Sequence, residues 1–341
     1  MKLALITTTI YVPRVLSLCR EFSKEVMFFI AGDRKTPHDE VHSFVSTLGN
    51  AIYYSDEDQD KLGYSCSEII GWNKIMRRNI ALLEAIKYGA DIIITIDDDN
   101  IPLSHDYFEV FESILTSPYN GPMASSETHW FNVGEFINPP VYHRGFPYDY
   151  RHIDLKVRLL PVRNAKVGVA AGLWLGDPDI DAMERITNRP TAYHLSEILR
   201  TGLLVDNTCF TPFNSQNTAY VAELAPLMMV WVGVGRYDDI WASYIAQRVM
   251  METEYHVHFG RPFVWQERNP QNLWRNLKDE IYGMEYTTKF CEDLLAANLG
   301  EGSILDKLNR LYEHLRAADY LPPVVYELGK LWCKDMEKVL R

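Results

Sequence analysis

The sequence has little that would suit it to a membrane, a disulfide framework or a polyanionic partner. Its longest apolar stretch, LAPLMMVWVGVG, is too short to cross a bilayer and contains two glycines. Its five cysteines are widely spaced without a CxxC pair, which argues against a disulfide or zinc framework and fits a reducing cytoplasm. Since 46 acidic residues exceed 34 basic ones, the net charge is −12, which excludes a general nucleic-acid binder.

The remaining composition is that of a globular protein. Of 341 residues, 47% are hydrophobic and 23% are charged, which excludes wholesale disorder and allows one large domain with or without an appendage. The segment MKLALITTTIYVP is apolar for only a few residues and lacks a small-residue cleavage site, so we expect a buried strand rather than a signal peptide. A cytoplasmic protein without membrane insertion is therefore expected.

Apolar runs and helical spacing alternate along the first hundred residues. Strands are expected at 2–10, 25–33, 51–57 and 91–100, with helical stretches at 13–24 and 66–89. Such alternation predicts an α/β fold with a mixed, mainly parallel sheet flanked by helices. Residues 118–236 indicate mixed strand and loop. Beyond them we expect a helix near 238–251, a strand at 256–266 and two amphipathic helices near 303–317 and 323–340.

Polar residues follow three of these apolar runs. The first run ends in Thr7, Thr8 and Thr9, the second stops at Asp33, and the run at 91–96 leads into three carboxylates. Ligands of parallel sheets bind beyond the carboxyl ends of the strands, so we expect these side chains to line one site.

Asp97, Asp98 and Asp99 carry the strongest functional signal. If the strand continues through them, Asp97 and Asp99 point to the same side, and two converging carboxylates repel each other unless a cation lies between them. Their hard oxygen ligands suit Mg²⁺ or Mn²⁺, which commonly bind ligand phosphates as well. The alternative is a solvated acidic turn or a helix N-cap.

Three other features are candidates for binding or catalysis. RGFPYDYR places Arg144 and Arg151 around an aromatic loop, and arginine suits phosphate, although two solvated surface arginines are the alternative. GVGRYDDIW predicts a loop leading into a helix, with Asp238 or Asp239 as the N-cap, as a catalytic group or as both. Trp174 could stack on a base or sugar, with core packing as the default.

Five motifs, taken in order, give the chain its resemblance to a known family: TIDDD, RGFPYDYR, GLWLGDPDIDA, TPFNSQNTAY and GRYDDIW. Together they resemble the reversibly glycosylated polypeptide family, whose plant members include UDP-arabinopyranose mutases. The resemblance implies a GT-A-like glycosyltransferase fold over residues 1–285, followed by a C-terminal helical extension over 286–341. It also implies a nucleotide-sugar ligand and Mn²⁺ or Mg²⁺ as cofactor.

The patterns and the resemblance together define the candidate site. Arg144 begins the motif whose arginine can become reversibly glycosylated in the family. The candidate catalytic residues are Arg144, Arg151, Asp238 and Asp239, and the candidate metal ligands are Asp97 and Asp99. The candidate nucleotide-sugar-binding residues are Thr7, Thr8, Thr9, Asp33, Arg78, Asp97, Asp98, Trp174 and Asn217.

The family's characteristic reaction interconverts pyranose and furanose forms of a sugar that stays on its nucleotide. Asn214 stands where plant members have cysteine, and some bacterial relatives act on GDP-sugars, so the resemblance implies a UDP- or GDP-linked sugar. Two alternatives stay open: a glycosyltransferase that passes the sugar to an acceptor, and a self-glycosylated scaffold protein. The C-terminal amphipathic helices pack either on the core or on another subunit, which leaves a homo-oligomer open.

Overall fold

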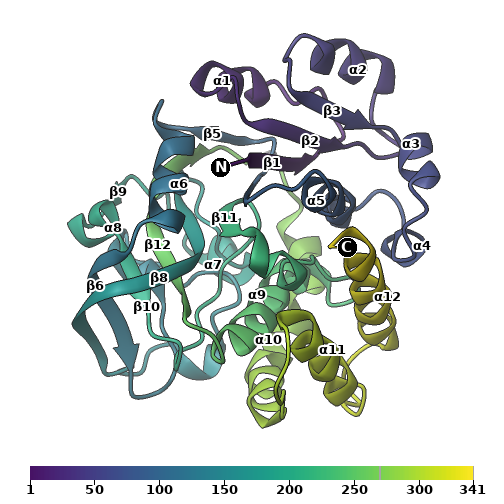
Figure 1. Ribbon diagram of the computed structural model, residues 1–341. Coiled ribbons are helices and arrows are strands. Elements are labelled where there is room, and N and C mark those ends of the chain that lie inside the picture. Colours follow the sequence, from purple (N-terminus) through teal and green to yellow (C-terminus); the bar gives the residue numbers. More distant parts are fainter. Residues whose placement is uncertain (269, 341) are drawn as a thin grey trace.

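A ten-stranded mixed sheet forms the centre of the molecule (Figure 1). The computed structural model describes residues 1–268 and 270–340. The strand order is β3-β2-β1-β4-β11-β8-β6-β10-β12-β5, and β8 pairs additionally with β12. The strands are β1 (Leu3–Thr8), β2 (Met27–Ala31), β3 (Ala51–Tyr54), β4 (Ile92–Ile96), β5 (Asn100–Pro102), β6 (Tyr119–Ser126), β8 (Val157–Gly176), β10 (Leu203–Val205), β11 (Asn217–Val221) and β12 (Tyr255–Gln266), with β7 (Ile137–Asn138) and β9 (His194–Leu195) as a separate pair.

Helices pack around this sheet. The N-terminal strands and their helices form one end of the molecule, and the C-terminal helices lie together at the other (Figure 1). The helices are α1 (Val15–Phe22), α2 (His38–Ser46), α3 (Asp56–Lys61), α4 (Ser67–Ile70), α5 (Arg78–Lys87), α6 (Tyr107–Thr116), α7 (Ala182–Thr187), α8 (Glu197–Thr201), α9 (Asp238–Met250), α10 (Leu273–Ala296), α11 (Ile304–Leu315) and α12 (Pro323–Val339). Among the described residues, none of these helices has the length and apolar character needed to span a bilayer.

The first four strands in sheet order are parallel, as the sequence predicts. β1 pairs in parallel with β2 and with β4, so these strands end at one edge of the sheet. β11 runs antiparallel to β4, and Asn217 at its start pairs with Ile96 at the end of β4. Because of this reversal, the segment that precedes β11 reaches the same edge. Residues from the middle of the chain therefore meet the acidic turn that follows β4.

The helical stretch expected at 66–89 is interrupted in the structure. α4 ends at Ile70 and is capped by Gly71, whose φ of +67° favours glycine. α5 begins only at Arg78, after the short 3-10 turn Ile75–Arg77. Between them, the backbone amides of Asn73 and Lys74 donate to the Asp33 carboxylate at 2.6 and 2.9 Å. These bonds replace helical ones and hold the segment at the carboxyl edge of the sheet.

The C-terminal helices share the core of the rest of the chain. One cluster of buried apolar side chains extends from β1 to α12. The Trp332 indole donates to the Pro226 carbonyl at 2.7 Å, and the buried Asp335 carboxylate accepts from the Cys66 amide at 2.8 Å. The predicted boundary between residues 285 and 286 lies within α10, a helix that the sequence reading did not anticipate. The division into two domains remains a prediction.

Trp332→Ala should lower the free energy of unfolding by about 3–5 kcal/mol, because it leaves a cavity in the core and removes the bond to Pro226. Urea denaturation measures the loss. Trp274→Ala is the matched control, since the Trp274 side chain on α10 is 67% exposed and should contribute little. Equal effects from the two substitutions would show that α12 is not integral to the folded core.

Candidate functional site

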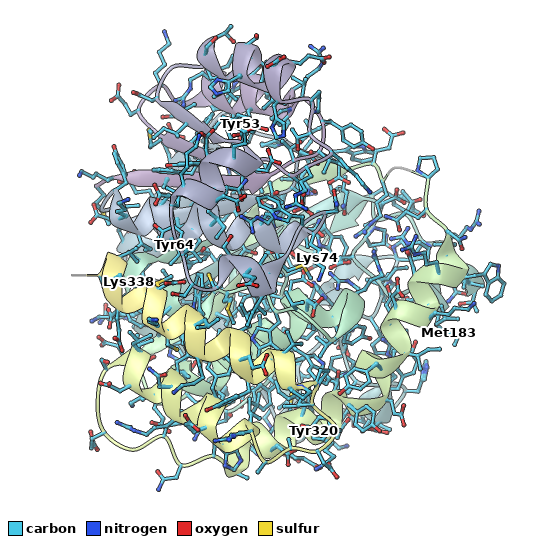
Figure 2. All side chains as sticks on the ribbon, turned by 90° about the vertical axis from the view of Figure 1, so that its right-hand side faces the viewer. Tyr53, Tyr64, Lys74, Met183, Tyr320 and Lys338 are labelled. Atoms are coloured by element: carbon cyan, nitrogen blue, oxygen red, sulfur yellow. The ribbon has the colours of Figure 1, made fainter. Side chains whose placement is uncertain are left out.

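A cleft in two connected halves lies at the carboxyl edge of the parallel strands. The β1 half, about 270 Å³, is lined among others by Thr8, Thr9 and the three consecutive carboxylates. The α9 half, about 300 Å³, is lined among others by Arg144, Asp238 and Asp239. Lys74, Ile75 and Asp97 line both halves. Lys74 lies where the N-terminal segments meet the rest of the chain (Figure 2).

The acidic triplet lies in a turn rather than in the strand. β4 ends at Ile96, so strand alternation does not orient Asp97 and Asp99, as the sequence argument assumed. All three carboxylates nevertheless line the β1 half. Asp97 forms an ion pair with Arg78, and Asp98 accepts a hydrogen bond from the Thr9 hydroxyl at 2.6 Å.

The charges of the triplet oppose one another. Burial, followed by the neighbouring charge of Asp97, raises the pKa of Asp99 to about 6. A divalent cation would relieve both costs. Within the described residues no three His, Cys, Asp or Glu side chains form a metal-binding group. Mg²⁺ sites that share ligation with phosphate need only one or two protein carboxylates, so Asp97 and Asp99 fit a partial ligand set of this kind.

Two of the candidate binding residues in the β1 half shape the cleft. The Asp33 carboxylate accepts from three backbone amides, those of Arg34, Asn73 and Lys74, so it holds the turn that presents Lys74. Arg78 is buried and donates to the Ser215 carbonyl and hydroxyl at 2.7 and 2.8 Å. It thereby ties the acidic turn to the segment that precedes β11.

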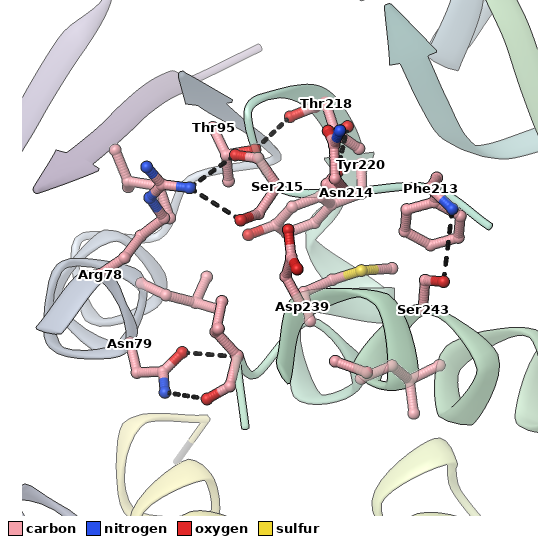
Figure 3. A pocket seen from close by; sticks show the side chains of 16 residues that line it. Arg78, Asn79, Thr95, Phe213, Asn214, Ser215, Thr218, Tyr220, Asp239 and Ser243 are labelled. Carbon is pink, nitrogen blue, oxygen red and sulfur yellow. Dashed lines mark hydrogen bonds between the residues drawn. The ribbon is translucent and has the colours of Figure 1, made fainter. Parts of the chain in front are cut away.

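Arg78 and Ser215 also line a small cavity of about 30 Å³ next to the cleft (Figure 3). Arg78 and Asp239 line it from two sides. The Asn79 side chain exchanges two hydrogen bonds with the Val230 backbone, each 2.8 Å long. The space is too small for a nucleotide, so the wider cleft in front of it is the candidate ligand site.

Four predicted site residues lie outside the cleft lining. The Thr7 hydroxyl is buried and donates to the Ile96 carbonyl at 2.7 Å. Trp174 is buried in the core, its default interpretation. Asn217 is buried and accepts from the Tyr107 hydroxyl at 2.8 Å. Arg151 faces a separate cavity, described below.

Arg144 is held between two carboxylates. Its Nε and Nη2 atoms donate to Asp179 at 2.9 and 3.1 Å, and Nη1 and Nη2 donate to Asp239 at 3.1 and 3.2 Å. Nη1 also donates to the Arg236 carbonyl. Burial alone would lower the pKa of Arg144, but the two carboxylates raise it well above the ordinary value. The guanidinium is therefore a fixed cation whose donors are already used.

Asp179 connects three segments of the chain beneath the α9 half. It is fully buried and accepts from Arg144, from Arg268 at 3.0 Å and from the Asn214 amide at 2.6 Å. Although burial opposes ionisation, the charges of Arg144 and Arg268 hold the pKa of Asp179 far below its usual range. The sequence patterns did not predict a role for Asp179, although it lies in the GLWLGDPDIDA motif.

Three cations of the α9 half were also missed: Lys74, Arg236 and Arg268. Lys74 and Arg268 are isolated charges without a recognisable pattern around them, whereas Arg236 lies within the GRYDDIW motif. A signal for Arg268 exists nonetheless, because it follows the end of β12 by two residues. Strand-end position, which identified the acidic triplet, would have identified Arg268 as well.

Asp238 and Asp239 lie in the first turn of α9, and the N-cap is Tyr237, so neither carboxylate is the cap that the sequence predicted. Asp238 accepts from the Val234 amide at 2.9 Å. Burial and, to a smaller extent, the charge of Asp239 raise the pKa of Asp238 to about 8. Asp238 therefore holds a proton at neutral pH, whereas Asp239 forms an ion pair with Arg144.

This architecture defines an α/β protein with a mixed sheet flanked by helices and a cleft at the carboxyl ends of its parallel strands. The family described as reversibly glycosylated polypeptide matches residues 16–301. The chain belongs to the reversibly glycosylated polypeptide family, as the sequence motifs predicted.

Named relatives of the chain include several plant proteins. UDP-arabinopyranose mutase 3 of Arabidopsis thaliana is 26% identical over 200 residues, covering 56% of this chain and 51% of the relative. Probable UDP-arabinopyranose mutase 1 of Pisum sativum is 25% identical over 221 residues, covering 61% and 56%. The chain spans about half the length of the curated relatives it matches.

Among solved structures, a mannosyltransferase from Pyrobaculum calidifontis in complex with GDP-Man and Mn²⁺ matches with a TM-score of 0.45 and 11% identity. The match covers 99% of this chain and 85% of the other.

Asp179→Asn should lower the free energy of unfolding by about 3–5 kcal/mol, because it leaves the Arg144 and Arg268 charges in a buried site without their shared partner. Chemical denaturation at pH 7 measures the loss. Glu127→Gln is the control, since the exposed Glu127–Arg158 pair should contribute almost nothing. A loss for Asp179→Asn as small as that of the control would contradict the central role of this carboxylate.

Asp238→Asn should raise the Tm at pH 7. The folded state keeps a proton up to about pH 8 that the unfolded state gives up near pH 3.8, so ionisation costs stability as the pH rises between these values. Asparagine removes that cost and should flatten the Tm profile over this range. Asp239→Asn should instead lower the Tm, because it breaks the pair with Arg144. A fall in Tm for both variants would contradict the conclusion that Asp238 is protonated at neutral pH.

Proposed function

We propose that this protein is a metal-dependent nucleotide-sugar mutase that interconverts the pyranose and furanose forms of a UDP- or GDP-linked sugar. The observation that carries the proposal is the cleft itself, where Asp97 connects an acidic turn in one half with paired carboxylates and fixed cations in the other. Membership of the family and relatives named UDP-arabinopyranose mutase support it.

The β1 half suits the nucleotide, with Thr8, Thr9 and Asp98 on its wall. Lys74 is positioned to bind the diphosphate where the two halves meet. Arg268, which pairs with Asp179, and Arg236, which pairs with Glu280, add two guanidinium groups to the α9 half. Asp97 and Asp99 would hold Mn²⁺ or Mg²⁺, which neutralises charge that develops on a departing diphosphate. Local cations thus offset the net negative charge of the chain.

The α9 half suits the sugar. A change of ring size requires that the ring oxygen leaving C1 gains a proton and that the attacking hydroxyl loses one. Asp238, protonated at neutral pH, is placed to donate the first proton, and Asp239 is placed to accept the second. Because Arg144 is fixed between Asp179 and Asp239, we assign it to orienting Asp239 rather than to contacting the diphosphate.

The state of the cysteines indicates the cellular location that we propose. All five cysteines are free and buried, which fits a reducing cytoplasm. We include a cytoplasmic location in the proposal. Whether the chain forms a homo-oligomer stays a prediction.

Incubation with Mn²⁺ and a panel of UDP- and GDP-sugars, followed by chromatography, tests the activity. A mutase yields a new isomer of unchanged mass. Free nucleoside diphosphate with a sugar-bearing acceptor would instead indicate a glycosyltransferase, and stoichiometric labelling without turnover a self-glycosylated scaffold.

Asp99→Asn should lower turnover on the order of 100-fold, because it removes part of the charge that holds the cation against the diphosphate. A chelator should abolish the activity of the unmodified protein, and added Mn²⁺ should restore it. Asp106→Asn is the control, since Asp106 is half-buried and pairs with Arg261 outside the cleft lining. Full activity of Asp99→Asn, together with inhibition by a chelator, would show that the metal binds elsewhere.

A further inference from the structure

A second cavity, which we call the Tyr148 cavity, has a volume of about 380 Å³ and shares no lining residue with either half of the cleft. Tyr142, Tyr148, Arg151, Glu135 and Glu184 line it, together with the exposed side of α7 that carries Met183. Figure 2 labels Met183 at the edge of the molecule, away from Lys74 of the cleft. The volume is within the range of small-molecule sites, roughly 300–1,000 Å³.

The loop over residues 144–151 separates the two sites. Arg144 at its start pairs with Asp179 below the cleft, and Arg151 at its end pairs with Asp181 at 2.6 Å beside the cavity. The two ion pairs fix both ends of the loop to one segment of the chain. These two ion pairs therefore hold the wall of the Tyr148 cavity in place.

Arg151 braces the aromatic wall instead of offering a free charge. Its guanidinium lies 3.8 Å from the centre of the Tyr148 ring and 4.9 Å from that of Tyr142. Its Nη2 atom donates to Asp181, and its Nε and Nη2 atoms donate to the Phe146 carbonyl at 3.3 and 3.1 Å. The Arg151 charge is therefore already paired with a carboxylate.

Polar side chains on the lining include two carboxylates, two amides, a hydroxyl and an imidazole, those of Glu135, Glu184, Asn132, Asn188, Thr187 and His152. Glu184 has a buried Oε2 atom without a hydrogen-bond partner among the described residues. Glu135 also lines the cavity, as does Asn188, the C-cap of α7. Groups of this kind hydrogen-bond to hydroxyls, and aromatic rings pack on the apolar faces of sugar rings.

We infer that the Tyr148 cavity binds an uncharged sugar unit at a site distinct from that of the nucleotide sugar. The aromatic wall, the two carboxylates and the pairing of Arg151 with Asp181 fit a polyhydroxylated, phosphate-free ligand. This site is additional to the proposed mutase activity and does not depend on it, since binding here requires neither a nucleotide nor a metal.

Saturation-transfer NMR and titration with methyl glycosides of arabinose, glucose, galactose and mannose test the inference. At least one of these probes should bind saturably to the unmodified protein in the absence of metal, and a saturating concentration of UDP with Mn²⁺ should not displace it. Failure of all four probes to bind, or displacement by UDP, would overturn the inference.

Tyr148→Ala should weaken binding of that probe roughly tenfold, because it removes the ring on which the sugar packs. Thr187→Trp should block the cavity from its rim while leaving the Arg151–Tyr148 contact in place. Tyr193→Ala is the control, an exposed tyrosine outside the cavity lining. Thermal melts establish that each variant is folded. Unchanged binding in folded Thr187→Trp would show that the sugar binds elsewhere and would contradict the inference.

Discussion

A single buried carboxylate, Asp179, is the interaction on which the geometry of the cleft depends. It binds Arg144 from the aromatic loop, Arg268 from the end of β12 and Asn214 from the segment before β11. Two guanidinium groups could not be buried in this region without a shared counter-charge, because an uncompensated buried charge is strongly destabilising. The same contacts that satisfy this requirement bring distant segments to the edge of the parallel strands.

The consequence is an electrostatic site that differs from the protein as a whole. The chain carries a net charge of −12, yet Lys74, Arg236 and Arg268 line the α9 half of the cleft. Arg144 is charged but already bound on both edges, so it orients a carboxylate instead of attracting an anion. An anionic ligand can bind because these cations line the cleft, even though the overall charge of the protein is negative.

Much of this arrangement could be predicted from residues whose local pattern is strong. The apolar run of β4 ending in three carboxylates, and the alternation of strands and helices before it, predicted the edge of the sheet where the cleft lies. Predictions failed where distant partners decide the outcome. The backbone amides of residues 73 and 74 donate to Asp33 instead of forming helical hydrogen bonds. Asn217 accepts a hydrogen bond from Tyr107 inside the core.

Isolated charges were the hardest to predict. Arg151 and Arg144 have the same sequence signal, but the loop between them turns one toward a cavity and the other toward the cleft. Lys74 and Arg268 have no motif, and only the sheet topology brings them together.

The most direct test of the account is the position of Mn²⁺ in crystals of this protein grown with UDP or GDP. An anomalous-difference map should place the metal against Asp97 and Asp99, with the diphosphate between it and Lys74. A metal peak away from the acidic turn, or a diphosphate bound outside the two halves of the cleft, would contradict the account.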